Sequence, residues 1–168
     1  MKKPSLYGML IALTFILSYV EFLLPLPWII VPGIKLGLPN VVILFTLYRY
    51  TGREAAIVSG VRILLFALTF GSISLAAYSA GGALLSIVAM TLARKAGVFS
   101  IAGVSMLGGV CHNIGQMIVA ILVLQTPALL YYSPILITVG ALTGILIGLV
   151  CRQVLMRMPK RRGILRDQ

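Results

Sequence analysis

The sequence predicts an all-α membrane protein, a bundle of six transmembrane helices, and three observations lead to that fold class. Hydrophobic residues make up 60% of the 168 residues and charged residues only 10%, with a mean hydropathy of +1.09. Soluble domains carry about 25% charged residues. Apolar segments long enough to cross a bilayer recur along the chain. The turns between them alternate between basic and nearly uncharged.

This alternation explains the net charge of +11. Basic residues fall at every second turn and in the tail: Lys2, Lys3, Arg49, Arg53, Arg94, Lys95, Arg152, Arg157, Lys160, Arg161, Arg162 and Arg166. The other turns hold one charge, Lys35 in 25–37, or none, in 71–77 and 126–133. Such a distribution follows the positive-inside rule. We therefore expect a multi-pass membrane protein with both termini in the cytoplasm, in contact with lipid and not with nucleic acid.

The expected helices follow one another with short connections, at about 5–24, 38–50, 53–70, 75–93, 101–124 and 135–156. We expect one transmembrane domain over 1–156 and a basic cytoplasmic tail over 157–168. Gly140, Gly144 and Gly148 recur at every fourth residue of the last helix. A stripe of small residues at this spacing is typical of a helix-packing face.

The first helix carries two features beyond its apolar character. Gly8 and Ala12 form a small-xxx-small pair, which lets another helix approach closely, either within this chain or on a partner. Glu21 lies near the outer end and is one of three acidic residues in the chain. It either takes part in a binding site or is a solvated carboxylate at the interface.

The stretch 25–40 contains four prolines and two glycines, which exclude a continuous helix. It is also too apolar for an ordinary solvated loop, since Trp28 begins a run of apolar residues. We expect it to fold over the outer mouth of the bundle as a lid, with Lys35 and Asn40 aimed inward or at lipid headgroups.

Arg62 lies near the centre of the third expected helix. An arginine at the bilayer midplane costs about 2.5 to 3.5 kcal/mol on insertion scales, so a partner is expected. Arg62 either pairs with Glu21 or binds an anionic or carbonyl-bearing ligand.

The fifth expected helix places His112, Asn113 and Gln116 near its midpoint. His112 and Gln116 share one face, and Asn113 projects about 100° from them. Because lipid cannot satisfy these groups, they face protein, water or a ligand. Arg62 lies at similar depth, so these four residues together predict a polar pocket. We also expect Tyr78, at the start of the fourth helix, to be one of its binding residues.

Several chemistries are excluded. One histidine, two separated cysteines and three acidic residues do not fill a transition-metal shell, so no metal and no cofactor is expected. The chain has no phosphate-binding loop for ATP and no carboxylate pair for acid–base chemistry or magnesium. We therefore expect a protein that is not an enzyme and that binds and moves a small molecule.

Three motifs resemble a known family. They are PGIKLGLPN at 32–40, SAGG at 79–82 and HNIGQ at 112–116. In this combination the chain resembles the bacterial Gx transporter family, also named heptaprenyl diphosphate synthase component I, over about 6–149. That family is similar to the S components of energy-coupling factor (ECF) transporters. The resemblance implies a substrate-binding subunit that works with a transmembrane coupling subunit and ATPases, with Gly8 and Ala12 at the contact.

The leading hypothesis is a subunit of an ECF-type importer. It would capture a small anionic or carbonyl-rich amphiphile, such as a quinone or prenyl precursor, a flavin or a vitamin-like molecule. An alternative is a non-catalytic membrane subunit that supports a prenyl-diphosphate synthase or another enzyme of the quinone pathway. A third is a channel or proton path through His112.

Overall fold

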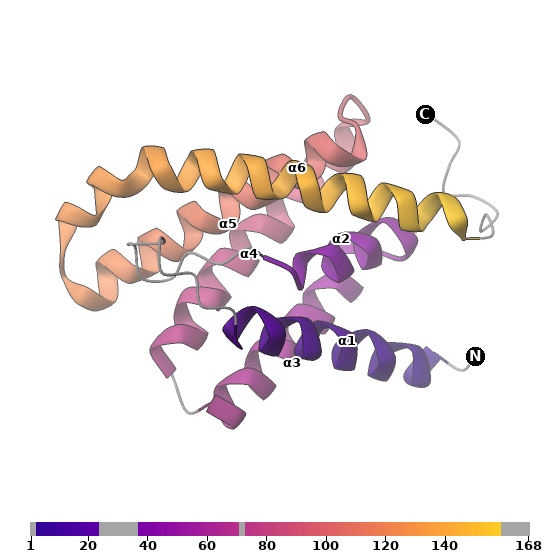
Figure 1. Cartoon of the computed structure of the whole chain (residues 1–168), viewed down its shortest axis with the longest axis horizontal. Helices are drawn as coiled ribbons and strands as arrows, with labels where there is room; N and C mark the ends of the chain where they lie inside the picture. Colours follow the sequence, from indigo (N-terminus) through magenta and orange to yellow (C-terminus); the bar gives the residue numbers. More distant parts are fainter. Residues whose placement is uncertain (1–2, 24–36, 71–72, 159–168) are drawn as a thin grey trace.

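The structure, a computed structural model, describes residues 3–23, 37–70 and 73–158, and none of these residues forms a strand. The described chain is helical almost throughout, as the sequence predicts (Figure 1). Its elements are α1 (Lys3–Leu23), α2 (Asn40–Arg49), α3 (Gly52–Phe70), α4 (Ile73–Ala96), α5 (Ile101–Leu124), the 3-10 helix η1 (Pro127–Tyr132) and α6 (Ser133–Arg157).

Local sequence signals set several helix ends. Glu54 accepts a hydrogen bond from the backbone N–H of Thr51 at 2.8 Å, and Thr51 Oγ1 accepts one from the N–H of Glu54, so the two residues form a capping box before α3. Ser100 caps α5 by accepting a hydrogen bond from Gly103 N at 3.1 Å. Gly97 ends α4 with φ of +71°, a conformation that glycine adopts without steric cost.

The helix bounds depart from the expected ones at two connections. Helix α4 begins at Ile73, inside the stretch 71–77 that was expected to be a loop, because the residues from Ile73 onward favour a helix. The stretch 126–133 was expected to be a plain loop but forms η1, whose first position is Pro127. Proline fixes φ near the helical value and needs no N–H partner there.

Four helical stretches are long and apolar enough to cross a membrane: Ser5–Leu23, Ile73–Ala96, Ile101–Leu124 and Pro127–Arg157. Helix α3 is 19 residues long but carries Arg53, Glu54 and Arg62, which lower its hydropathy. Helix α2 has only 10 residues. It is therefore roughly 15 Å long, about half the thickness of a bilayer's hydrocarbon core.

The helices pack in an order that differs from their order in the chain. Helix α5 packs along both α4 and α6, while α3 packs on α4 and on α1. The short α2 fills the space between α3 and α6. Helix α4 thus lies between α3 and α5, which make no extensive contact with one another (Figure 1).

Glycines bring α5 and α6 into backbone contact. A Cβ built on Gly109 of α5 would lie 2.2 Å from the carbonyl oxygen of Gly140, and one on Gly144 would lie 2.6 Å from that of Ser105. Gly148 meets α5 in the same way, at Ala102. The predicted packing face on the last helix is confirmed, and its partner is α5 of the same chain.

The apolar core lies at the end of the bundle where α1 begins and α6 ends (Figure 1). Its buried members are Leu10, Val42, Ile43, Leu44, Leu47, Tyr48, Ala55, Val58, Met90, Ala93, Ile101, Val104, Ile147 and Cys151. Several buried polar residues lie toward the opposite ends of these helices: Ser18, Glu21, Arg62, Ser79, His112 and Gln116. The molecule therefore has one apolar end and a polar region toward the other.

Candidate functional site

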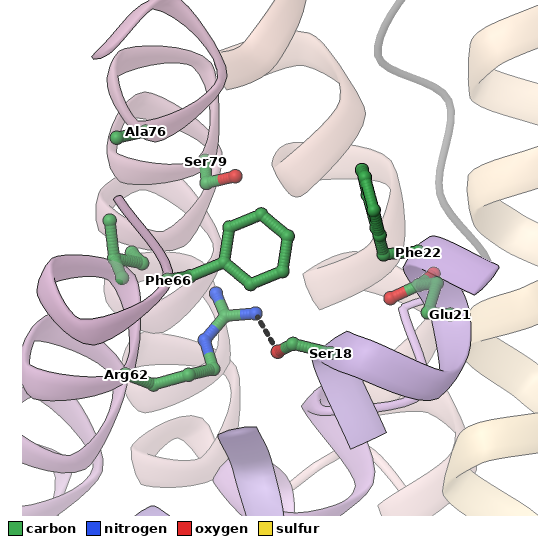
Figure 2. A pocket seen from close by; sticks show the side chains of 8 residues that line it. Ser18, Glu21, Phe22, Arg62, Phe66, Ala76 and Ser79 are labelled. Atoms are coloured by element: carbon green, nitrogen blue, oxygen red, sulfur yellow. Dashed lines mark hydrogen bonds between the residues drawn. The ribbon is translucent and has the colours of Figure 1, made fainter. Parts of the chain in front are cut away.

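A cavity of about 40 Å³ lies between α1, α3 and α4, with Arg62 on its wall. Its lining residues are Ser18, Glu21, Phe22, Arg62, Ile63, Phe66, Ala76 and Ser79 (Figure 2). A cavity needs about 10 to 15 Å³ by this measure to hold one water, so there is room for roughly three waters or a small polar group. Pockets that enclose a drug-sized molecule are several times larger, about 300 Å³ or more.

Arg62 is the central polar group of this cavity. It is 8% exposed, and its guanidinium points from α3 toward α1 (Figure 2). The Nη1 donates a hydrogen bond of 3.0 Å to Ser18 Oγ, whereas Nε is buried and has no hydrogen-bond partner in the described part of the chain. An unmade hydrogen bond of a buried donor costs about 1 to 3 kcal/mol, and more for a charged group. The free donor marks Arg62 as a residue that a ligand would satisfy.

Glu21 places a negative charge on the opposite wall. It is 7% exposed, so the interpretation as a solvated interfacial carboxylate is wrong. Glu21 Oε1 accepts a hydrogen bond from the backbone N–H of Gly37, and the carboxylate interacts electrostatically with Arg62. Figure 2 shows Glu21 and Arg62 on opposite sides of the same space. The lining residues described here therefore carry one positive and one negative charge.

Aromatic rings form the apolar side of the cavity. Phe22 and Phe66 line it and contact each other edge to face, with ring centroids 5.8 Å apart. Phe70 packs on both rings and on Tyr19. Phe66 is 8% exposed, but Phe22 is 52% and Tyr19 43% exposed. We call these four residues the aromatic cluster, which extends from the cavity to the outer surface of α1.

The polar residues of α5 lie behind α4 and do not line this cavity. A Cβ on Gly82 of α4 would lie 2.7 Å from Gln116 Cγ and 2.9 Å from His112 Cε1, so both side chains pack against Gly82. Asn113 turns toward α6 instead, and its Nδ2 donates a hydrogen bond of 2.8 Å to the carbonyl of Leu136. Gly82 is three residues beyond Ser79, which faces the cavity. The two polar groups thus lie on either side of the first half of α4.

Other predicted residues are placed as follows. Tyr78 is buried on α4 next to Ser79 but is not part of the cavity wall. Asn40 begins α2, and its Nδ2 lies near Gly37, whose N–H binds Glu21. Lys35 and residues 25–36 of the predicted lid lie outside the described residues.

Ser18, Phe22, Phe66 and Ser79 are site residues that the sequence analysis missed. A signal for Ser18 exists in the sequence: Thr14, Ser18 and Glu21 recur at spacings of four and three residues in an otherwise apolar helix. Residues at these spacings share one face. Such a polar face indicates which side of α1 turns toward the bundle interior. The two phenylalanines carry no such signal, because both helices are rich in apolar residues and a phenylalanine among them does not stand out.

The described residues contain no group of three or more His, Cys, Asp or Glu side chains that could hold a metal ion. Among the described lining residues, Glu21 is the one with a carboxylate. What this wall offers is hydrogen bonding: a guanidinium, a carboxylate and two hydroxyls. Its chemistry suits recognition of a small polar group.

A family model described as heptaprenyl diphosphate synthase component I matches residues 10–154. The chain belongs to this family. The match covers every described residue of the cavity wall and all of the α5 polar residues. No curated protein matched the chain, and no solved structure did. The description of the heptaprenyl diphosphate synthase component I family names one component of a synthase, and the fold found here for a member is a helical one with several membrane-spanning candidates.

Proposed function

We propose that this protein is the substrate-binding membrane subunit, of S-component type, of an ECF-type importer in the bacterial cytoplasmic membrane. It captures from the outer side a small amphiphile whose head is anionic or rich in carbonyl groups, such as a quinone or prenyl precursor, a flavin or a vitamin-like molecule. The observation that carries the proposal is Arg62, a buried arginine on the wall of a cavity with a free donor atom.

Burying the charged side chain of Arg62 in the bundle costs free energy, which a bound ligand would offset. Among the described residues, Arg62 donates a hydrogen bond to Ser18, and Glu21 lies across the space. Intramembrane ionisable groups that face a cavity commonly belong to substrate pathways. We propose that Arg62, Glu21, Ser18 and Ser79 contact the ligand. His112, Asn113 and Gln116 form a second polar layer across α4, and Tyr78, Asn40 and Lys35 complete the site.

The proposed topology has six helices and both termini in the cytoplasm. The basic residues Arg49 and Arg53 lie at the junction of α2 and α3, and Arg94 and Lys95 lie at the end of α4. Arg157 ends α6 at the same end of the molecule. The positive-inside rule makes this end the cytoplasmic one. The cavity then lies nearer the outer surface.

A face of α1 supports the proposed contact with the coupling subunit. Gly8 and Ala12 are exposed, and a Cβ at Gly8 meets no atom within 4 Å. They are therefore not used for packing inside this chain. Small residues on an exposed membrane helix allow another helix to approach its backbone closely.

The experiment is a gentle purification of the full-length protein from its native membrane, with native mass spectrometry of the complex. We expect a coupling subunit, two ATPases and a retained small molecule that is lost in Arg62→Gln. Arg53→Gln is the matched control, since Arg53 is an exposed arginine on the same helix. Retention of the same molecule by Arg62→Gln contradicts the proposed site.

The family description favours a second candidate, a non-catalytic membrane subunit that supports a prenyl-diphosphate synthase. The same purification separates the two candidates. Co-isolation with an aspartate-rich soluble synthase, and without ATPases, supports the second candidate and contradicts the importer.

A further inference from the structure

We infer that the ligand of the Arg62 cavity is a lipid-soluble amphiphile that enters laterally from the outer half of the bilayer, between α1 and α3. Its small head carries a hydrogen-bond acceptor for Arg62, and its apolar chain stays among the aromatic rings between these two helices. The inference rests on the ligand-binding function proposed above and selects, within its ligand range, the lipid-soluble class over the water-soluble one.

One side chain, Phe22, belongs both to the cavity wall and to the surface of the molecule. It lines the cavity, and 52% of it is exposed. Figure 2 shows Phe22 on the α1 side of the space, opposite Phe66 and Arg62 on the α3 side. Exposed side chains change rotamer within picoseconds to nanoseconds. Rotation of this one half-exposed ring is therefore enough to connect the cavity with the outside.

The contact between α1 and α3 consists of aromatic rings from the cavity outward. On α3, Arg62, Phe66 and Phe70 recur at every fourth residue and so share one face. On α1, Tyr19 and Phe22 are three residues apart and also share a face. The ring centroid of Phe70 lies 5.7 Å from that of Tyr19 and 5.0 Å from that of Phe22. The aromatic cluster thus continues from the cavity toward the outer ends of both helices.

This contact differs from the one between α5 and α6. There, a Cβ on Gly109 would lie 2.2 Å from the carbonyl oxygen of Gly140, so backbone meets backbone and no passage remains. Between α1 and α3, side chains separate the two backbones, and a chain of methylene groups can take the place of a ring that turns away. The α1–α3 contact is therefore the one that opens at lower cost.

The surface around the aromatic cluster is apolar on both helices. Val20 and Leu23 are exposed on α1, which is a candidate membrane span, and Leu65 and Leu68 are exposed on α3. Water would cover such a surface only at a cost in free energy, whereas lipid covers it without one. The passage along the rings therefore opens to the lipid, and a ligand that uses it is dissolved in the bilayer.

Arg62 and the size of the cavity define the head of the ligand. The Nε of Arg62 is buried and has no hydrogen-bond partner among the described residues, so it calls for an acceptor such as a carbonyl oxygen. The cavity of about 40 Å³ has room for a group of roughly three heavy atoms. A fused ring system such as a flavin does not fit inside it. The remainder of the ligand therefore lies along the aromatic cluster.

The first experiment locates the chain, with the full-length protein in nanodiscs. The probe is dodecanamide that carries a photoreactive diazirine at carbon 8. Specific labelling is the part that a hundredfold excess of plain dodecanamide removes, and its sites are mapped by mass spectrometry of peptides. We expect specific labelling at residues 19–22 and 66–70. No specific labelling, or specific labelling on other helices instead, overturns the inference.

The second experiment tests the route with a removable cross-link. Tyr19→Cys and Phe70→Cys place two thiols where the ring centroids are 5.7 Å apart, in a protein that also carries Cys111→Ala and Cys151→Ala. A short linker with a reducible bond then joins α1 to α3. Compared with the unlinked variant, linking before the probe is added should lower specific labelling at least tenfold. Linking after loading should retain the probe during a chase with dodecanamide, and reduction should restore both entry and exit.

The control links the same two helices at their other end. Tyr7 donates a hydrogen bond of 2.6 Å to Glu54, so Tyr7→Cys with Glu54→Cys accepts the same linker away from the aromatic cluster. This link should change specific labelling by less than twofold. Full entry of the probe while residues 19 and 70 are linked, or equal blocking by both links, overturns the lateral route.

The outcome for the importer is separate. Butanamide, the same head with a short chain, should bind at least a hundredfold more weakly than dodecanamide. If the molecule retained in the native complex is water-soluble and has no apolar chain, the inference is wrong, whereas co-isolated ATPases would still support the importer. A lipid-soluble molecule retained without ATPases supports the inference and contradicts the importer.

Discussion

Arg62 of α3 donates a hydrogen bond of 3.0 Å to Ser18 Oγ of α1 inside the bundle, and the Ser18 hydroxyl donates one of 2.8 Å to the carbonyl of Thr14. One hydroxyl thus links a buried cation to the backbone of a neighbouring helix. This hydrogen bond connects α1 to α3 beside the cavity.

Replacing Ser18 by alanine should destabilise the protein by about 1 to 3 kcal/mol, because a buried guanidinium N–H loses its acceptor. The measurement is the midpoint of thermal unfolding in mild detergent. Thr138→Ala is the control, since its exposed hydroxyl bonds only within α6, to the carbonyl of Pro134. Equal midpoints for both variants would show that the Arg62–Ser18 bond contributes nothing.

Asn113 should act on stability and not on ligand binding. Its Nδ2 joins α5 to the Leu136 carbonyl of α6, away from the cavity. We expect Asn113→Ala to lower stability by about 0.5 to 1.5 kcal/mol, the usual net value of one hydrogen bond. Retention of the co-purified small molecule in native mass spectrometry should stay within twofold of wild type. A tenfold loss of affinity would instead place Asn113 in contact with the ligand.

Gly109→Ala should prevent correct packing of α5 on α6. The added Cβ would lie 2.2 Å from the Gly140 carbonyl oxygen, and backbone atoms on both sides leave little room to adjust. We expect a loss of about 3 kcal/mol or more, within the range for overpacked cores. Gly60→Ala on α3 meets no atom within 4 Å and should be neutral or stabilising by up to about 1 kcal/mol. The two unfolding midpoints decide this.

Gly8→Leu should leave the isolated protein folded and weaken its complex. A side chain at Gly8 meets no atom of this chain within 4 Å. A leucine would, however, hold a docked helix away from the α1 backbone. The measurement is the yield of coupling subunit that co-purifies with the variant, with the unfolding midpoint as the control. Full co-purification would exclude this face of α1 from the contact.

Arg94→Ala should loosen the end of α2. Arg94 donates hydrogen bonds to the carbonyls of Leu47 and Tyr48, and its guanidinium lies 5.0 Å from the centre of the Tyr48 ring. Charged hydrogen bonds to terminal helix carbonyls are worth about 1.5 to 3 kcal/mol, so a loss of that size is expected. Lys95→Ala, one residue further and exposed, should change the unfolding midpoint little.

The sequence predicted the fold well where apolar length and capping decide the structure. The α5 bounds, Ile101–Leu124, were predicted from a long apolar run, whereas its cap at Ser100 was not predicted. The glycine stripe of α6 was predicted as a packing face for the same kind of local reason. The extent of η1 was not predicted, since short uncharged turns of this kind have no periodic pattern.

The site was predicted in part. Arg62 and Glu21 were identified because a charge in an apolar helix is conspicuous, and both line the cavity. His112 and Gln116 were expected to share that pocket with Arg62 because of similar depth. They lie on the other side of α4, however, since depth along a helix does not determine which neighbour a face meets. Phe22 and Phe66 belong to the wall only through the crossing of α1 with α3.

The glycine contacts have a consequence for motion. At Gly81, Gly115, Gly109 and Gly140 the backbones of α4, α5 and α6 lie too close for any side chain to slide between them. We therefore expect these three helices to move together as one rigid unit. Helices α1 and α3 meet instead through side chains, among them the aromatic rings, the Arg62–Ser18 bond and the hydrogen bond of Tyr7 to Glu54, so we expect them to move outward more easily. Backbone amide hydrogen exchange should accordingly be fastest in α1 and α3 while a ligand enters the cavity.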